Sequence, residues 1–242
     1  MTYAPLAPQG RVVLVTGANR GIGRAISERL AADGFSLSLG ARDPKSLEPV
    51  TLAVDRTRVL ANTYEARTAK SAAAWVAATV QRFGRIDAVI CNAGVGLNFS
   101  VETGDEALLD EMWEVNAKAP LRLIRAAFPF LKASGHGRVI TIVSLSGKRV
   151  STDALTGYSM SKYAAMALTH GVRFAGWQHG IRATAICPGF VATDMTANVT
   201  VMKREDMIDP GAIAALVSTT LSLPNTASVV EIPINCRLEH SV

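Results

Sequence analysis

The sequence predicts an α/β fold with one doubly wound domain and a parallel, seven-stranded sheet. Short apolar segments of strand length alternate with longer segments of helical periodicity over the 242 residues. The short segments are apolar almost throughout, which is typical of parallel strands that helices cover on both faces. A glycine-rich turn joins the first strand to the first helix, and open sheets of this kind bind ligands at such turns.

The order of these segments defines the expected elements. Strands are predicted at 11–16, 35–40, 57–61, 87–92, 137–143, 181–187 and 229–234. Helices are predicted at 22–33, 68–82, 105–131, 155–178 and 211–222. No repeat or linker interrupts the alternation, so we expect one domain over residues 1–242, a size that a single α/β unit reaches.

The composition argues against several classes of protein. No apolar run reaches the ~20 residues that cross a bilayer, although 49% of the residues are hydrophobic. The first eight residues lack the features of a signal peptide, so we expect a cytoplasmic protein. The net charge of +5 comes from scattered residues, which disfavours nucleic acid and suits an anionic cofactor and an anionic substrate. The cysteines and histidines form no ligand-spaced cluster, so no metal is expected.

The glycine-rich turn follows the first strand directly and opens into the first helix. Its glycines let a ligand approach the backbone closely, and the helix N-terminus offers free N–H groups to a pyrophosphate. The residues expected to contact a dinucleotide there are Gly17, Asn19, Arg20, Gly21, Ile22 and Gly23. A glycine turn that binds nothing is the alternative that the motif alone leaves open.

A tyrosine and a lysine lie four residues apart in the predicted helix 155–178, at Tyr158 and Lys162. Residues with this spacing share one helix face, so the ammonium group is expected beside the phenol oxygen. A nearby positive charge lowers the pKa of a phenol from its usual value near ~10. Tyr158 is therefore predicted to exchange a proton near neutral pH, unless the pair is an ordinary surface contact.

Five segments of the chain, in order, resemble the short-chain dehydrogenase/reductase (SDR) family. They are the turn Thr16–Gly23, the segment Cys91–Gly94, Asn116, the group of Ser144 with Tyr158 and Lys162, and the segment Pro188–Thr193. The resemblance covers nearly the whole chain. It implies a Rossmann fold and an NAD(P)-dependent oxidoreductase that interconverts a ketone or aldehyde and an alcohol by hydride transfer.

The resemblance also implies the roles of the catalytic residues. Tyr158 is expected as the general acid and base, and Lys162 as the group that binds the nicotinamide ribose and lowers the Tyr158 pKa. Ser144 is expected to bind the substrate carbonyl, and Asn116 to kink a helix and hold a water that leads to Lys162. Ser144 lies fourteen residues before Tyr158, where thirteen is commoner in the family, so Ser146 stays an alternative.

Cofactor choice is expected to depend on the residues after the second strand. NAD enzymes usually place an acid there for the ribose 2′-hydroxyl, and this position falls on Ala41. Arg42 follows, and Arg20 lies in the glycine turn, so two guanidinium groups are available for a 2′-phosphate. We therefore expect NADP rather than NAD. Asp43 is interpreted as the N-cap of a helix that begins at Pro44, with a ribose contact as the alternative.

Further cofactor contacts are implied by the resemblance. Glu65 and Ala66 correspond to the family's Asp-Val pair beside the adenine, and Cys91 stands where an asparagine is common. The remaining contacts are expected at Asn92, Ala93, Gly94, Pro188, Gly189, Val191 and Thr193, with the last two at the nicotinamide carboxamide.

Two segments are predicted to be mobile loops at the ligand-binding edge, 95–104 and 194–209. In the family the second of these covers the substrate as a lid. An apolar substrate pocket is expected from Leu97, Phe99, Leu155, Phe190 and Met195. These side chains indicate a hydrophobic ketone and nothing narrower.

The leading function is thus an NADP(H)-dependent carbonyl reductase or alcohol dehydrogenase. An alternative is a 3-oxoacyl reductase acting on acyl-carrier-protein thioesters, although Gly135 and His179 occupy positions where such enzymes tend to carry arginines. A protein that senses NADP without turnover is a second alternative, but such relatives usually lose the tyrosine or the lysine. The resemblance also implies a homotetramer or homodimer, built on the helix that carries Tyr158.

Overall fold

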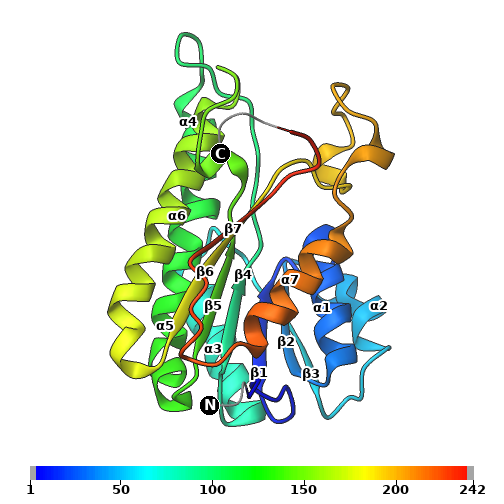
Figure 1. Cartoon of the computed structure of the whole chain (residues 1–242), viewed down its shortest axis with the longest axis vertical. Coiled ribbons are helices and arrows are strands. Elements are labelled where there is room, and N and C mark those ends of the chain that lie inside the picture. The colour runs from blue at the N-terminus through cyan, green and yellow to red at the C-terminus, as the bar shows by residue number, and fades with distance from the viewer. Residues whose placement is uncertain (1–3, 239–242) are drawn as a thin grey trace.

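A seven-stranded parallel sheet lies at the centre of the computed structural model, which describes residues 4–238 (Figure 1). The strands are β1 (Val12–Thr16), β2 (Ser36–Ala41), β3 (Val59–Thr63), β4 (Ala88–Cys91), β5 (Arg138–Ile142), β6 (Arg182–Pro188) and β7 (Glu231–Ile234). Their order in the sheet is β3-β2-β1-β4-β5-β6-β7, and every pairing is parallel. The order reverses between β1 and β4, where a doubly wound sheet opens a crevice for ligands.

Helices cover both faces of the sheet (Figure 1). One layer contains α1 (Gly21–Asp33), α2 (Glu48–Thr51) and α7 (Pro210–Ser222), and the other contains α3 (Ala69–Phe83), α5 (Ala119–Ser134) and α6 (Thr156–Gly176). A shorter helix, α4 (Glu106–Trp113), precedes α5. Within residues 4–238, no helix is long and apolar enough to cross a membrane.

The two apolar cores follow from the alternation of side chains along each strand. Val13 and Val15 of β1 pack in the core with α1 and α7, whereas Val12 and Leu14 pack in the core with α3 and α5. Successive side chains of a strand point to opposite faces of the sheet, so a fully apolar strand serves both layers. This explains why the strands read as continuous apolar runs in the sequence.

The predicted doubly wound fold with seven parallel strands is confirmed, and the predicted strands lie within two residues of the observed ones. The predicted helix 105–131 is wrong as a single element. A π-helical turn at Glu114–Lys118 separates α4 from α5, which continues to Ser134. The short helix Pro44–Leu47 begins where the interpretation of Asp43 as an N-cap placed it, whereas α2 at Glu48–Thr51 was not predicted, because a helix of four residues is too short to show a periodicity.

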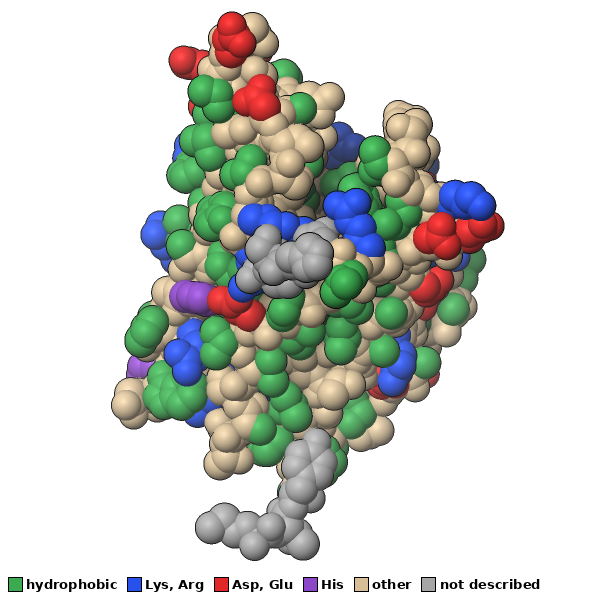
Figure 2. Space-filling model, turned by 45° about the horizontal axis from the view of Figure 1, so that its top comes forward, with side chains coloured by type: hydrophobic (Ala, Val, Ile, Leu, Met, Phe, Trp, Pro, Cys, Tyr) green, Lys and Arg blue, Asp and Glu red, His purple; other side chains and the backbone are tan. Residues whose placement is uncertain are grey.

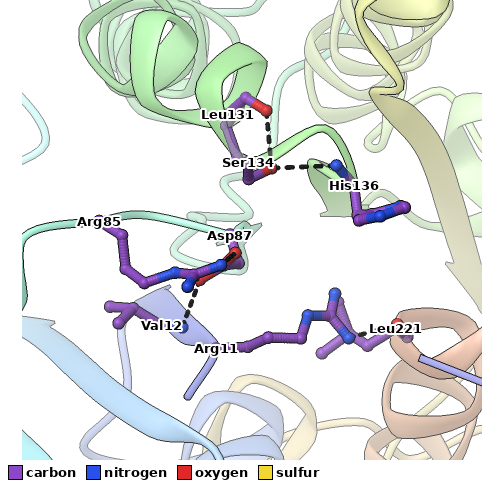
Figure 3. Close-up of polar contacts among 8 residues, drawn as sticks. All are labelled: Arg11, Val12, Arg85, Asp87, Leu131, Ser134, His136 and Leu221. Carbon is purple, nitrogen blue, oxygen red and sulfur yellow. Dashed lines mark hydrogen bonds and ion pairs between the residues drawn. The ribbon is translucent and has the colours of Figure 1, made fainter. Parts of the chain in front are cut away.

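Buried charges hold the strands together at the amino-terminal edge of the sheet (Figure 3). The carboxylate of Asp87 accepts hydrogen bonds from the Val12 amide at 2.8 Å and from the Arg85 guanidinium at 2.7 and 2.9 Å. Arg11 donates to the carbonyl oxygen of Leu221 at 2.8 Å and so joins β1 to α7. Burial lowers the pKa of Arg11, and the nearby Asp87 opposes this change. These charges stabilise the fold at the edge opposite the ligand-binding crevice.

Candidate active site

A cavity of about 420 Å³ lies at the carboxyl ends of the strands, in the crevice where the strand order reverses. It gathers residues that are far apart in the sequence, from Gly17 to Thr196. Of the predicted site residues, its lining includes Gly17, Asn19, Arg20, Gly21, Ile22, Arg42, Glu65, Ala66, Asn92, Ala93, Gly94, Ser144, Tyr158, Lys162, Pro188, Gly189, Val191 and Thr193.

Two predicted site residues, Gly23 and Asn116, are not part of this lining. Gly23 lies behind the glycine turn, where a Cβ atom would overlap the carbonyl oxygen of Gly17 and the side-chain amide of Asn92. A glycine is therefore required there by the packing of the turn, and the expected direct contact with a ligand is corrected to an indirect one. Asn116 lies behind Gly94, as described below.

The glycine turn is fixed by hydrogen bonds to the end of β4. Asn92 donates from its side-chain amide to the carbonyl oxygens of Thr16 and Gly17 at 2.9 and 3.2 Å. The Thr16 hydroxyl accepts from the amides of Asn92 and Ala93 at 2.8 and 2.9 Å. Gly17 has a φ of 62°, which only glycine adopts readily. The N-cap of α1, Arg20, makes no side-chain capping bond, so the first N–H groups of the helix suit a pyrophosphate.

The side chains after β2 differ in what they do. Asp43 accepts a hydrogen bond from the Lys45 amide at 3.0 Å and caps the short helix Pro44–Leu47, so the capping interpretation is confirmed. Arg42 lines the cavity, and Arg20 approaches Asp194 at 3.4 Å from the other side. Both members of this ion pair are largely exposed, so it adds little stability and leaves the guanidinium group available to a ligand.

Glu65 holds the turn after β3. Its carboxylate accepts from the Arg67 amide at 3.2 Å, and its own amide donates to the Ser71 hydroxyl at 2.9 Å. Tyr64, directly before it, lines the cavity and was not predicted. Tyr64 directly follows β3, and residues at the carboxyl end of a parallel strand are candidates for the ligand site. The predicted strand 57–61 ended two residues before the observed one, so Tyr64 was not recognised as such a residue.

Ser144, Tyr158 and Lys162 all line the cavity. A hydrogen bond joins the side chains of Ser144 and Tyr158, and the Ser144 hydroxyl accepts from the Ser146 amide at 3.1 Å. Lys162 donates from Nζ to the carbonyl oxygen of Ile142 at 3.0 Å. The cavity lining includes Ser144 and not Ser146, so the structure favours the first of the two serines in the substrate position.

The expected lowering of the Tyr158 pKa is wrong for this structure. Burial raises the pKa of Tyr158 to about 12 because it disfavours the phenolate, and the hydrogen bond with Ser144 only partly opposes this. Lys162 does not counter the effect, since its ammonium group lies 5.6 Å from the centre of the tyrosine ring and bonds to Ile142. Burial also lowers the pKa of Lys162 to about 8. Near neutral pH the phenol is therefore protonated.

Asn116 occupies the π-helical turn between α4 and α5, so the predicted kink is present at this residue. Its side-chain amide is engaged by the protein. It accepts from the Val95 amide at 2.9 Å and donates to the Val95 carbonyl at 2.8 Å and the Ser161 hydroxyl at 2.9 Å. A Cβ atom on Gly94 would lie 3.1 Å from Asn116 and 3.5 Å from Lys162 Nζ, so glycine allows the chain to pass between them.

The predicted apolar pocket is only partly correct. Of its five expected side chains, Met195 lines the cavity. Phe99 instead pairs with Leu155 in an isolated β-bridge and packs against Gly157, because the first loop folds back onto the start of α6. The lining residues that were not predicted are Ala41, Ser46, Tyr64, Arg67, Val95, Val115, Ile142, Val143, Asp194 and Thr196.

Cys91 is buried in β4, where it replaces the asparagine expected from the resemblance. Burial raises the pKa of its thiol to about 12, and that of the Cys187 thiol to about 11. A thiol with such a pKa stays protonated and unreactive at neutral pH. Both cysteines are therefore packing residues of the sheet.

The fold and the site together define a Rossmann-type domain with a cavity at the crevice of its sheet. The family model of the short chain dehydrogenases matches residues 11–204, and the chain therefore belongs to that family. The predicted resemblance is confirmed.

Curated relatives agree with this assignment. An agropine synthesis reductase of Rhizobium rhizogenes is 41% identical over 232 residues, which are 96% of this chain and 54% of the relative. The chain thus spans about half the length of that protein. A levodione reductase of Leifsonia aquatica is 33% identical over 205 residues, which are 83% of this chain and 76% of the relative.

Solved structures share the fold over almost the whole chain. A crystal structure of levodione reductase superposes with a TM-score of 0.85 at 30% identity, covering 93% of this chain and 96% of that one. An alcohol dehydrogenase of the archaeon Thermococcus sibiricus, complexed with 5-hydroxy-NADP, gives a TM-score of 0.86 at 30% identity. It covers 95% of this chain and 99% of its own.

Proposed function

We propose that the protein is an NADP(H)-dependent carbonyl reductase or alcohol dehydrogenase, with one catalytic domain over residues 1–242. The observation that carries the proposal is the convergence of Ser144, Tyr158 and Lys162 in the cavity that the glycine turn also lines. A phenol, a hydroxyl and an ammonium group at one end of a dinucleotide-sized cleft suit hydride transfer to a carbonyl carbon. The reductase names of two relatives support the same chemistry.

Each residue has a defined task in this reaction. A bound nicotinamide supplies the hydride. Tyr158, protonated at neutral pH, donates its proton to the carbonyl oxygen, and Ser144 stabilises the negative charge that develops there. Lys162 would bind the nicotinamide ribose and provide a nearby cation. Asn116 positions the loop at Val95 through its side-chain amide, and a water beside this residue would lead protons to Lys162. The protonated phenol suits the reduction direction, because reduction requires an acid.

The preference for NADP is supported by the charges around the ribose end of the cavity. Arg20 and Arg42 both line it, and Ala41 offers no carboxylate for a 2′-hydroxyl. Asp43 also lines the cavity, but its Oδ1 accepts from the Lys45 amide as a helix cap, and the two guanidinium groups are proposed to bind a 2′-phosphate. The other proposed cofactor contacts are Gly17, Asn19, Gly21, Ile22, Glu65, Ala66, Asn92, Ala93, Gly94, Pro188, Gly189, Val191 and Thr193, with Gly23 acting through the turn.

A turnover assay tests both the carbonyl reduction and the preference for NADP. It uses a panel of ketones and aldehydes with NADPH and NADH at equal concentrations. We expect oxidation of NADPH and a clearly weaker reaction with NADH. Arg42→Ala should raise the KM for NADPH by about tenfold and leave that for NADH unchanged, since only one cofactor loses a charge-assisted bond. Arg56→Ala, in an exposed turn away from the cavity, is the matched control. Equal use of both cofactors would contradict the proposed preference.

Two alternatives are separated by the same assay. A 3-oxoacyl reductase would reduce an acyl-carrier-protein thioester far faster than a free ketone. An NADP-sensing protein would bind NADPH and oxidise none of it. The retention of Tyr158, Lys162 and Ser144 in one cavity favours a catalyst over a sensor. One relative, of which this chain covers 54%, is named agropine synthesis reductase. A reduction in agropine synthesis is therefore a further candidate activity for the whole protein.

An assembly of two or four copies is supported by the outer face of α5 and α6. Large apolar side chains are exposed there, namely Leu121, Met160, Tyr163, Phe174 and Trp177. Such a patch marks an interaction surface, and a homodimer or homotetramer would cover it. Light scattering on the protein and on Phe174→Glu measures the assembly. A monomer in both cases would refute the proposed arrangement.

A lid over the substrate is the proposed role of 194–209. The segment contains two short 3-10 turns, Asp194–Thr196 and Arg204–Asp206, and touches the glycine turn through Asp194 and Arg20. We expect limited proteolysis to cut this segment more slowly when NADPH is bound. Unchanged cleavage would contradict lid closure. We also propose a cytoplasmic location, which a fluorescent fusion would test.

A further inference from the structure

We propose that Glu231, the first residue of β7, positions the catalytic residues of this reductase. Its carboxylate binds Lys148, at the end of the turn that holds Ser144. The same carboxylate contacts His170 of α6, the helix that carries Tyr158. The inference rests on the proposed function and adds a residue to it from outside the cavity, since Glu231 is not among the lining residues. Glu231 therefore acts on the reaction only through the two elements that it joins.

The turn after Ser144 is short and internally hydrogen bonded. The Ser144 hydroxyl accepts from the Ser146 amide at 3.1 Å, and the Ser144 carbonyl oxygen accepts from the Gly147 amide at 3.0 Å. The Lys148 amide donates to the carbonyl oxygen of Leu145 at 2.9 Å. Ser144 and Lys148 thus belong to one compact turn, so a movement of Lys148 is passed on to the Ser144 hydroxyl.

The turn packs directly on the backbone of α6. A Cβ atom on Gly147 would lie 3.0 Å from the carbonyl oxygen of Lys162 and 2.5 Å from Val143 Cγ1, so glycine allows this close approach. The side chains of Ser144 and Tyr158 are hydrogen bonded to each other across the same contact between turn and helix. A shift of the turn along the helix would therefore change the distance between the two hydroxyl groups that act on the substrate.

His170 lies on α6 two turns after Lys162. Lys162, Met166 and His170 are four residues apart in succession, and residues with this spacing are neighbours on a helix face. Met166 packs in a small apolar core that joins α6 to the turn and to β6. The other members of this core are Val143, Leu145, Ala165, Ala185 and Cys187. His170 therefore extends the side of α6 that faces the turn and the sheet.

The Glu231 carboxylate reaches the turn and the helix through different oxygen atoms. Lys148 Nζ lies 2.6 Å from Oε2, and His170 Nε2 lies 3.1 Å from Oε1. Figure 2 shows a histidine side chain directly beside an acidic one on the face that it draws, and His170 and Glu231 form a pair of this kind. The side chains of Lys148 and Glu231 are only 23% and 26% exposed, so salt screens this pair less than an exposed one.

The strand provides a fixed support for this carboxylate. Glu231 pairs with Ala185 of β6 in the parallel sheet, and the Ala185 amide donates to the carbonyl oxygen of Val230 at 2.9 Å. The hydrogen bond between the side chains lowers the pKa of Glu231 and raises that of Lys148, so both groups are charged at neutral pH. A charged group on a rigid strand that holds two neighbouring elements restricts their relative movement.

The first test measures kcat and KM separately in variants of the pair. The substrate is the ketone or aldehyde of the panel that the unmodified protein reduces fastest with NADPH. Glu231→Gln and Lys148→Met should each lower kcat by about tenfold, because a displacement of ~1 Å at a catalytic group can cost ~10² in rate. The KM for NADPH should stay within about twofold of the unmodified value, since neither residue lines the cavity.

Two further variants are controls. Lys148→Arg keeps a cation that can bind the carboxylate, so it should regain most of the activity that Lys148→Met loses. Glu28→Gln removes the acid of an exposed ion pair with Arg24 on α1, and its kcat should equal that of the unmodified protein.

A double-mutant cycle tests whether Glu231 acts through Ser144. If it does, Glu231→Gln should lower kcat by less than about twofold when it is added to Ser144→Ala, because the positioned hydroxyl is already absent. Independent effects of the two substitutions would multiply instead. A general loss of stability would also multiply with the loss of the hydroxyl, so the cycle separates positioning from a merely structural role.

The two levels of the hypothesis fail in different ways. If no carbonyl compound supports oxidation of NADPH by the unmodified protein, the proposed function fails. If ketones are reduced but Glu231→Gln and Lys148→Met keep their kcat, only the positioning inference is overturned. The same holds if the losses of Glu231→Gln and Ser144→Ala multiply, or if the KM for NADPH rises as much as kcat falls. An unchanged KM for NADPH shows that a variant is folded.

Discussion

Both edges of the sheet contain a buried cation, but the two cations differ in how many protein acceptors they bind. At the amino-terminal edge, Arg138 is 2% exposed and donates to Leu223, Asn225 and Gly137 at 2.6, 2.9 and 3.0 Å. At the carboxyl-terminal edge, Lys162 is 6% exposed and makes its hydrogen bond to one carbonyl oxygen of Ile142. The first cation is held by the protein itself, and the second is held beside a cavity.

This difference separates a structural charge from a functional one. A buried cation that several protein acceptors surround is stabilised within the fold and has no capacity left for a ligand. Lys162 retains donor capacity next to the cavity. Burial lowers the pKa of both groups, to about 8 for Lys162 and to about 10 for Arg138, so the pKa change does not separate them. Burial alone does not identify an active site; incomplete bonding beside a cavity does.

The largest expected effect is at the carboxyl-terminal edge. Tyr158→Phe should lower kcat by at least ~10², because the general acid is lost, while the free energy of unfolding changes by less than ~1 kcal/mol. Steady-state assays and denaturant titration measure the two quantities. Near-normal turnover in this variant would remove the proposed mechanism.

The opposite pattern is expected at the amino-terminal edge. Asp87→Asn keeps an acceptor for Val12 but removes the charge that faces Arg85 and Arg11, so it should lower the free energy of unfolding by about 2 kcal/mol. The kcat of the folded fraction should not change. If Asp87→Asn kept its stability and lost activity, the assignment of a structural role to the amino-terminal edge and a catalytic role to the carboxyl-terminal edge would be wrong.

The pH dependence of stability sharpens the comparison further. Lys162 has a pKa of about 8 in the folded protein and ~10.4 in an unfolded chain, so between these values the unfolded chain binds more protons. Lys162 should therefore add a contribution to the free energy of unfolding that rises with pH from about 8, by at most ~1.4 kcal/mol per pH unit. The buried thiols of Cys91 and Cys187, with pKa values raised to about 12 and about 11, act in the opposite direction above about 9. Arg138 contributes a similar rise only above about 10, where the raised pKa of Tyr158 also opposes it.

Denaturant titrations at a series of pH values, on the unmodified protein and on Lys162→Met, measure this slope. The contribution of Lys162 is the free energy of unfolding of the unmodified protein minus that of the variant, and this difference should increase between pH 8 and 10, since no titrating group remains at the position in the variant. If the difference did not change with pH, Lys162 would not be the group responsible.

The smallest effect is expected for Ser146→Ala. Ser146 contributes its backbone amide to Ser144, and alanine keeps that amide, so turnover should stay within roughly twofold. Ser144→Ala removes the hydroxyl itself and should lower kcat by about tenfold or more. Equal losses of kcat in the two variants would mean that both serine hydroxyls stabilise the charge on the carbonyl oxygen.

Much of this protein could be predicted from local patterns. The continuous apolar strands and the glycine turn determine the fold class and the ligand-binding edge, because both depend on neighbouring residues only. The spacing of Tyr158 and Lys162 likewise indicates one helix face. The same reasoning missed Tyr64, since a two-residue error in a strand end moves a residue out of the predicted site.

The sequence by itself thus determined the order of the elements and the chemical groups available at the crevice. The tertiary structure decided how those groups are used. Contacts between distant segments insert a π-helical turn at Asn116, desolvate Tyr158 so that its pKa rises, and bring Asn235 and Leu145 to Gly189. Such effects depend on desolvation and packing across the fold, which no local pattern of residues contains.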